Sequence, residues 1–113
     1  MNISLNKGKR GEIVAKEYLL LKGYEILETN YHSRYGEIDI VAKIDEELVF
    51  CEVKTFKKNS FVSPLEAVDD LKLQKIKITI EDYINKKDLY NVDCRIDVVV
   101  VGNNVVLEHL KHC

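Results

Sequence analysis

Two charged patterns stand inside apolar stretches of this 113-residue chain. Asp39 lies within the mostly apolar segment 37–43, and Glu52 and Lys54 lie within the similar segment 48–55. A charged side chain in a buried strand costs free energy unless a partner compensates its charge. Two carboxylates beside a lysine can bind a divalent cation and act on a phosphate ester, so the chemistry of the chain is expected here.

A β-hairpin would bring these charges together if Asp45 and Glu46 formed its two-residue turn. In that register Asp39 faces Glu52, with a Cβ separation of about 4.5–5.5 Å. The opposite face of the hairpin is wholly apolar, which predicts core. The facing pairs are Asp39–Glu52, Glu37–Lys54 and Val41–Phe50 on one face, and Ile38–Val53, Ile40–Cys51 and Ala42–Val49 on the other.

The opposed carboxylates favour a metal site. Like charges directly across a sheet are destabilising, and in a partly dry cleft at least one carboxyl group tends to keep its proton. A divalent cation removes this repulsion, and oxygen ligands suit Mg²⁺ or Mn²⁺. Lys54 points to the same side as Glu52 and can orient a water molecule or neutralise charge on a phosphate. The residues alone leave an alternative open, in which Glu37 pairs with Lys54 and the two acids are exposed to solvent.

Helix and strand patterns around these segments predict the elements that position them. Residues 7–22 favour a helix that Gly23 ends. Segment 63–66, Ser-Pro-Leu-Glu, is a capping box with proline at the first helical position, which predicts a second helix that continues to about Lys86. The alternative is a break near Asp69 and Asp70, where a second N-cap could lie. Strands are expected at residues 24–31, 37–43, 48–55, 92–101 and 105–110.

The order of these elements is α-β-β-β-α-β-β, and a turn at Asn103 and Asn104 joins the last two strands. The economical architecture for this order is an α/β fold in which helices cover the faces of the sheet. Within the fourth strand, Arg95 and Asp97 share a face and are expected to pair, and segment 98–101 is expected in the core.

Length and composition predict a single domain over residues 1–113. The hydrophobic fraction of 46% and the charged fraction of 32% indicate a soluble globular protein. No apolar run reaches the roughly 18 residues that would span a bilayer, and segment 1–11 lacks the apolar region of a secretory signal. Three cysteines without a Cys-x-x-Cys motif favour a reducing cytoplasm, and Cys51 and Cys94 are expected as small core residues.

The formal net charge of −2 does not by itself indicate nucleic-acid binding. Basic residues nevertheless cluster, which leaves open both a local basic surface and ordinary solvated faces of helices and loops. The clusters are Lys7, Lys9 and Arg10; Lys54, Lys57 and Lys58; and Lys72, Lys75 and Lys77.

The motifs of this chain resemble those of the PD-(D/E)xK nucleases. Segment 36–39, Gly-Glu-Ile-Asp, and segment 50–55, Phe-Cys-Glu-Val-Lys-Thr, carry the resemblance. Together with further matches they resemble the small YraN-like bacterial family, which is itself similar to archaeal Holliday-junction resolvases. The resemblance covers nearly the whole chain. The further matches are Gly8, Arg10-Gly11-Glu12, Gly23-Tyr24, Asn30-Tyr31 and Glu66-Ala67-Val68.

This resemblance implies a restriction-endonuclease-like α/β core, with a central mixed five-stranded sheet flanked by helices. It implies that Asp39 and Glu52 are metal ligands and that Lys54 is the catalytic lysine. It also implies that Glu12 is a helix-borne acid that joins the site. Taken alone, Glu12 could equally be a first-turn acid that the helix dipole favours.

Two departures from the family pattern concern phosphate contacts, since His32 and Phe56 stand where the family usually has basic residues. The proline that names the motif is also absent, and Ile38 precedes Asp39 instead. Lys75 and the loop residues that follow His32 could equally be ordinary exposed side chains. Candidate accessory residues are Glu37, Thr55 and Lys75, and candidate nucleic-acid contacts are Lys9, Arg10, Arg34, Tyr35, Lys57 and Lys58.

The first hypothesis is therefore a Mg²⁺- or Mn²⁺-dependent endonuclease that hydrolyses DNA phosphodiester bonds, with branched or flapped DNA as a candidate substrate. The second is a non-catalytic nucleic-acid-binding module of the same fold, in DNA repair, recombination or competence, which predicts salt-dependent binding without hydrolysis. The third is a protein-interaction scaffold, which the net acidity favours and the intact acid–acid–lysine set disfavours. Related resolvases are dimers, which suggests a homodimer. DNA, and not a membrane, is the expected partner.

Overall fold

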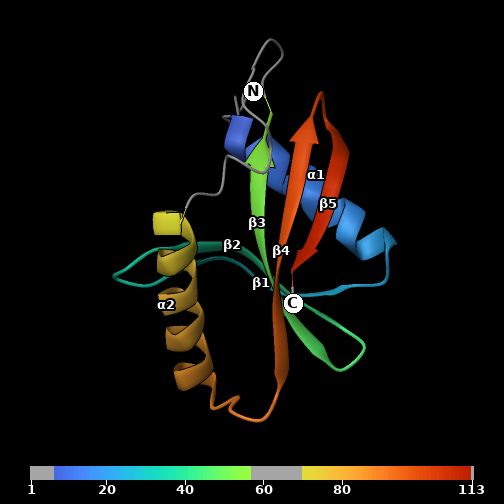
Figure 1. Cartoon of the computed structure of the whole chain (residues 1–113). Coiled ribbons are helices and arrows are strands. Elements are labelled where there is room, and N and C mark those ends of the chain that lie inside the picture. Colours follow the sequence, from blue (N-terminus) through green and yellow to red (C-terminus); the bar gives the residue numbers. More distant parts are fainter. Residues whose placement is uncertain (1–6, 57–69, 113) are drawn as a thin grey trace, which may run out of the picture.

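Five strands form one sheet in the order β1-β2-β3-β4-β5 in the computed structural model, which describes residues 7–56 and 70–112. Neighbouring strands are antiparallel, except that β3 and β4 are parallel. The predicted α-β-β-β-α-β-β order and the mixed five-stranded sheet are confirmed (Figure 1). The elements are α1 (Lys7–Leu21), β1 (Glu25–His32), β2 (Glu37–Ile44), β3 (Glu47–Thr55), α2 (Asp70–Lys87), β4 (Asp93–Gly102) and β5 (Val105–His112).

Helix α1 ends at the glycine that the sequence places there. Gly23 has a left-handed backbone with φ 92°. The N–H groups of Gly23 and Tyr24 donate to the carbonyl groups of Leu20 and Leu19, respectively. This is the Schellman arrangement, which satisfies carbonyl groups that the helix end would otherwise leave without donors. It turns the chain from α1 into β1, while Ala15 and Leu19 remain fully buried against the sheet.

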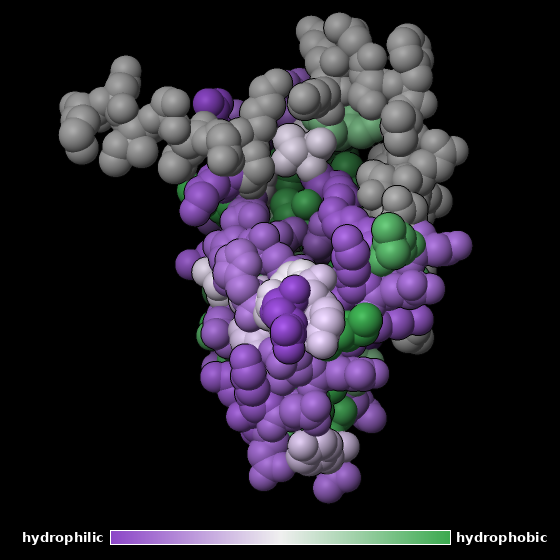
Figure 2. All heavy atoms as spheres, turned by 90° about the vertical axis from the view of Figure 1, so that its left-hand side faces the viewer, coloured by the Kyte–Doolittle hydropathy of each residue, from purple (hydrophilic) through white to green (hydrophobic). Residues whose placement is uncertain are grey.

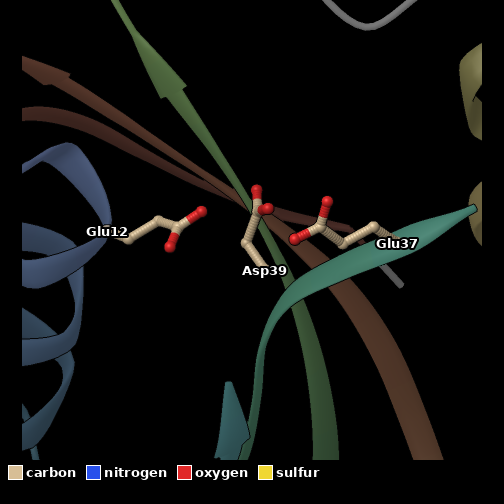
Figure 3. A group of neighbouring side chains, drawn as sticks. All are labelled: Glu12, Glu37 and Asp39. Atoms are coloured by element: carbon tan, nitrogen blue, oxygen red, sulfur yellow. The ribbon is translucent and has the colours of Figure 1, made fainter. Parts of the chain in front are cut away.

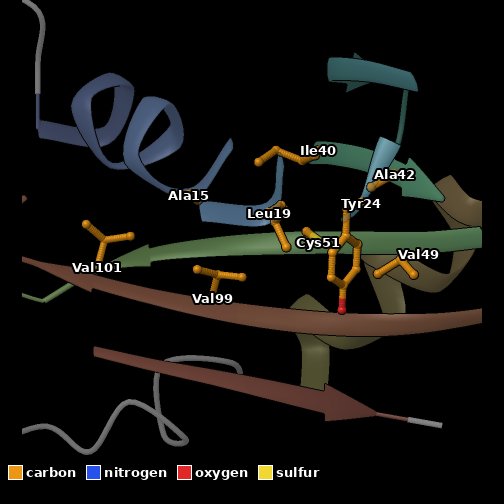
Figure 4. Packing of buried hydrophobic residues seen from close by; sticks show 9 residues of the cluster. All are labelled: Ala15, Leu19, Tyr24, Ile40, Ala42, Val49, Cys51, Val99 and Val101. Atoms are coloured by element: carbon orange, nitrogen blue, oxygen red, sulfur yellow. The ribbon is translucent and has the colours of Figure 1, made fainter. Parts of the chain in front are cut away.

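The sheet is buried on both faces, because α1 covers one face and α2 covers the other (Figure 1). Successive residues of β3 therefore enter different cores, which is why this strand is apolar without alternation. The core on the α1 side (Figure 4) contains Ala15, Leu19, Tyr24, Ile40, Ala42, Val49, Cys51, Val99 and Val101. The core on the α2 side contains Tyr31, Ile38, Val41, Leu48, Phe50, Ile76, Ile80 and Tyr83.

The hairpin of β2 and β3 has the predicted register near its turn, where residues 40–44 pair with residues 47–51. The predicted pairs further from the turn are not part of this ladder. Instead, Oδ2 of Asp39 accepts a hydrogen bond from the N–H of Val53 at 2.8 Å. Ile38 packs in the core on the α2 side, so the prediction of one wholly apolar face that includes Ile38 is wrong. The ladder of β2 and β3 therefore ends next to Asp39, where a carboxylate takes up a backbone donor.

The second hairpin also follows the sequence. Both asparagines of the 103–104 turn have positive φ, 51° and 60°, as a tight two-residue turn requires. Segment 98–101 is buried, as predicted. Cys51 is buried as well, but Cys94 is exposed, so its prediction as a core residue is wrong. Cys94 lies at the start of β4, and the burial of this strand begins only at Asp97.

Helix α2 is described from Asp70 onwards, and its predicted capping box at residues 63–66 lies outside the described residues. Ile76, Thr79, Ile80 and Tyr83 are its buried residues. Their spacing of three and four residues makes one stripe that faces the sheet. Among the helices within residues 7–56 and 70–112, none is both long and apolar enough to cross a membrane.

Candidate functional site

Carboxylates from two elements converge beside the end of the β2–β3 ladder. Glu12 comes from α1, and Glu37 and Asp39 come from β2. One carboxylate oxygen from each residue lies within 4.8 Å of the others. Figure 3 shows Glu12 and Glu37 reaching from opposite sides towards Asp39. Such an oxygen-only set is the kind of ligand group that hard divalent cations prefer.

Gly11 allows Glu12 to reach this position. A Cβ atom on Gly11 would lie 2.5 Å from Oγ1 of Thr55 on β3, a distance that side chains do not tolerate. A side chain at position 11 would therefore require the Thr55 side chain to turn or α1 to move away from β3. Ala15 and Leu19, on the following turns of α1, are fully buried and hold the helix against the sheet. Because Glu12 is the next residue along α1, this contact also determines the position of its carboxylate.

Asn30 of β1 links the two glutamates. With its amide nitrogen turned towards the acids, it donates to Oε1 of Glu37 at 3.0 Å and to Oε2 of Glu12 at 3.1 Å. Its φ of 53° lies in the left-handed region, which asparagine tolerates better than most residues. Asn30 therefore positions Glu12 and Glu37 as a neutral donor and leaves the excess negative charge in place.

The carboxyl groups of this cluster are costly to ionise together. Burial raises the pKa of Asp39 to about 7, and the negative charge of Glu52 adds to the effect. Burial also raises the pKa of Glu12, against the hydrogen bond from Asn30, and the charge of Glu37 raises it further. At neutral pH, part of the population therefore keeps a proton on Asp39 unless a cation compensates the charge.

Glu52 lies next to this group and is paired with two lysines. Its side chain is buried, with 6% of the residue exposed. Oε1 of Glu52 lies 3.3 Å from Nζ of Lys54 on the same strand and 2.6 Å from Nζ of Lys72 on α2. Burial lowers the pKa of Lys54, and the neighbouring Lys72 lowers it further. Glu52 is not one of the three carboxylates within 4.8 Å of one another, but its charge still acts on Asp39.

A cavity of about 510 Å³ joins these groups. This volume lies within the range of roughly 300–1,000 Å³ that is usual for ligand sites. Carboxylates and ammonium groups line the same space, so a cation and a phosphate group could both find partners in it. The lining residues are Glu12, Gly36, Glu37, Asp39, Glu52, Val53, Lys54, Leu71, Lys72, Lys75 and Ile76.

The structure brings one part of the predicted site set into this cavity and leaves the other part outside it. The predicted residues that line the cavity are Glu12, Glu37, Asp39, Glu52, Lys54 and Lys75. Thr55 instead lies at the contact with Gly11. The predicted nucleic-acid contacts Lys9, Arg10, Arg34 and Tyr35 are exposed, and Lys57 and Lys58 lie outside the described residues. In the loop before β2, the guanidinium carbon of Arg34 lies 5.7 Å from the centre of the Tyr35 ring.

Sequence reasoning missed Lys72 and Asn30 as parts of this region. Lys72 precedes Lys75 by three residues, so helical spacing placed both lysines on one face and carried a signal for Lys72. Asn30 had no signal from spacing, and the family resemblance included it with Tyr31 but gave it no role. The pairing of β1 with β2 has an irregularity between Ile26 and Glu28, so simple alternation along β1 could not place Asn30 beside the acids.

The family model and the sequence relatives that match this chain belong to the same family. Residues 11–101 match the model of the family described as "Uncharacterised protein family UPF0102". A UPF0102 protein of Persephonella marina is 40% identical over 106 residues, which cover 94% of this chain and 90% of the relative. A UPF0102 protein of Clostridioides difficile is 46% identical over 95 residues, which cover 84% and 83%. The crystal structure of an fdxN element excision controlling factor protein from Anabaena variabilis covers 90% of this chain and 98% of its own, with a TM-score of 0.44 and 13% identity. That structural likeness is too low to support an inference about function.

Proposed function

The chain belongs to the UPF0102 family, and we propose that it is a metal-dependent nuclease that hydrolyses DNA phosphodiester bonds. The observation that carries the proposal is the group of three carboxylates, Glu12, Glu37 and Asp39, beside the buried ion pair of Glu52 and Lys54. The order of these residues along the chain also follows the pattern of the PD-(D/E)xK nucleases. Branched DNA is the candidate substrate class, because the motifs also resemble those of archaeal Holliday-junction resolvases.

The donor set supports Mg²⁺ or Mn²⁺ as the cofactor. Asp39 and Glu52 would hold the cation, with Glu12 and Glu37 as supporting ligands. Four carboxylates outnumber the three lysines that line the same cavity, and burial makes the charged form of Asp39 costly. When bound, the cation supplies the positive charge that this site lacks and polarises a phosphate.

Lys54 supplies the hydrogen-bond donors of the proposed reaction. Its side chain is 20% exposed, so the ammonium group is held within the cavity rather than in bulk solvent. From there it can donate to an attacking water and to a phosphate oxygen as negative charge develops. The N–H of Val53 fixes Oδ2 of Asp39, which limits the orientations of this carboxylate before any substrate arrives.

A cleavage assay tests the proposal. The full chain is incubated with junction, flap and single-stranded DNA in Mn²⁺, and then in EDTA. We expect cleavage in Mn²⁺ only, and a loss of about 100-fold or more in Glu52→Gln, because a ligand that acts in the transition state is removed. Glu46→Gln, in the turn of the same hairpin, is the matched control and should cleave like the wild type. Absence of cleavage by the wild type on every substrate, or equal rates for Glu52→Gln, would contradict the proposal.

A non-catalytic nucleic-acid-binding module is the second candidate. The observation that favours it is the double pairing of Glu52, because Lys54 and Lys72 compensate this carboxylate without a metal ion. It predicts binding of DNA that weakens with rising salt, and no cleavage in the same assay.

A further inference from the structure

Lys72 stands in an unusual position for a surface lysine. It lies near the start of α2, and its Nζ is 2.6 Å from Oε1 of Glu52 on β3. The same oxygen also faces Nζ of Lys54 at 3.3 Å. One oxygen of a buried carboxylate is therefore paired with two lysines, although the charge of one lysine would be enough to neutralise the carboxylate.

We propose that Lys72 is an exchangeable cation, which holds Glu52 in the metal-free protein and turns to the phosphate backbone of DNA when a divalent cation takes its place. The inference rests on the proposed function, in which Glu52 is a metal ligand. A divalent cation bound at either oxygen of Glu52 would lie close to both ammonium groups and would repel them strongly. Binding of the cation therefore displaces one of the two lysines.

Lys72 is the lysine that can leave. Its side chain is 38% exposed, compared with 20% for Lys54. Lys54 is part of the same strand as Glu52, two residues along, so it stays on the same side of the sheet. Lys72 comes from a separate element and reaches Glu52 through a flexible four-carbon stem, which can swing while α2 stays in place.

The surroundings of Lys72 indicate where its charge would go. Lys72 and Lys75 are one helical turn apart and line the cavity from the α2 side, opposite the acids of α1 and β2. The side of the molecule on which α2 lies is mostly hydrophilic (Figure 2). A released ammonium group would thus join Lys75 at a polar surface, where a phosphodiester can replace the carboxylate as its partner.

Calorimetric titration of the full chain with Mn²⁺, without DNA, tests the first half of the inference. We expect Lys72→Met to bind Mn²⁺ about three- to tenfold more tightly than the wild type, because a competing cation is gone. Lys72→Arg keeps the charge and should bind like the wild type. Lys77→Met, on the same helix but not in the cavity lining, is the matched control for loss of one positive charge. Equal or weaker binding by Lys72→Met, relative to Lys77→Met, overturns the inference.

Binding of DNA in Ca²⁺, measured over a range of salt concentrations, tests the second half. Loss of one phosphate contact in Lys72→Met should reduce the slope of log affinity against log salt by about one, with no change in Lys77→Met. An unchanged slope in Lys72→Met overturns the phosphate contact.

Tighter Mn²⁺ binding by Lys72→Met without any cleavage by the wild type would contradict the proposed function and keep the metal exchange. Cleavage by the wild type with equal Mn²⁺ affinities would contradict only the exchange, and failure of the wild type to bind Mn²⁺ would overturn both.

Discussion

Two aspartates of one sheet, one fully buried and one partly buried, have opposite electrostatic environments. Asp97 on β4 is fully buried, and its carboxylate lies 2.6 Å from Nε2 of His109 and 2.9 Å from Nε of Arg95. Burial alone would raise the pKa of Asp97, but the hydrogen bonds from His109 and Arg95 outweigh it, so that the pKa lies below its ordinary value of 3.8. The pKa of Asp39 on β2 is raised to about 7, because burial is joined there by the charge of Glu52.

The difference lies in the partners, because Asp97 is the more deeply buried of the two and yet has the lowered pKa. Arg95 also donates to Oε1 of Glu47 and to the hydroxyl of Tyr24, each at 2.7 Å, so the network of Asp97 closes within the protein. This network is a structural unit that needs nothing from outside. The four acids around Asp39 outnumber the three lysines of the same cavity, and a cation bound among them would relieve their mutual repulsion. The contrast separates a cluster whose buried carboxylate receives hydrogen bonds from Arg95 and His109 from a cluster whose carboxylates repel one another.

Replacing each aspartate by asparagine should give the largest difference in stability between the two sites. Asp97→Asn should lower the free energy of unfolding by about 3–5 kcal/mol, because it leaves the buried charge of Arg95 without its main partner. Asp39→Asn is the matched substitution and, in EDTA at neutral pH, should be as stable as the wild type or more stable, because it removes a repelled charge. Urea denaturation measures both. Equal destabilisation by the two substitutions would mean that the partners of the two carboxylates do not distinguish the sites.

A second substitution, Gly11→Ala, lies next to the acidic cluster around Asp39 and away from the network of Asp97. Gly11→Ala places a methyl group against Thr55 and should lower the free energy of unfolding by about 1–3 kcal/mol, the usual effect of overpacking. It should also weaken Mn²⁺ binding, because α1 carries Glu12. Lys16→Ala, at an exposed position of the same helix, should change stability by less than about 0.5 kcal/mol. A Gly11→Ala protein with unchanged stability and Mn²⁺ affinity would show that the close approach of α1 is not required.

The pH dependence of stability should also differ between Asp39 and Asp97, with a smaller effect than the substitutions above. Because the pKa of Asp39 is raised on folding, the folded protein binds more protons than the unfolded chain between pH about 4 and about 7, and the free energy of unfolding falls as pH rises through this interval. The expected loss is about 1–2 kcal/mol, since water reaches part of the side chain and reduces the full effect.

Asp97 contributes in the opposite direction. Its stabilisation is complete above the ordinary pKa of 3.8 and is lost as pH falls through its lowered pKa. Urea denaturation of the wild type and of Asp39→Asn across this pH range, in EDTA, separates the two groups. If the slope between pH about 4 and about 7 is the same in both proteins, Asp39 does not have a raised pKa.

Much of this arrangement was readable in the sequence. Alternation and the Asp45-Glu46 turn predicted the hairpin pairing from Ile40 to Ile44, and shared-face spacing predicted the pair of Arg95 and Asp97. These features depend on local periodicity, which a single sequence carries.

Other features depend on tertiary approach and could not be read in the same way. The bond from Val53 to Asp39 replaces a ladder pair that the periodic pattern predicts. The contact of His109 with Asp97 requires the register of β5 on β4, and the approach of Lys72 to Glu52 requires the placement of α2 on the sheet. Each of these contacts joins residues that are far apart in the sequence, so no periodic spacing predicts that they meet.

Anomalous X-ray diffraction from crystals soaked in Mn²⁺ tests the central claim most directly, because it locates the ion without reference to any substrate. The claim predicts one strong anomalous peak at the carboxylates of Asp39 and its neighbours, and none at the hydrogen-bonded network of Asp97. A saturating soak that leaves the acids around Asp39 without a peak, or that places the ion at Asp97 instead, would contradict it.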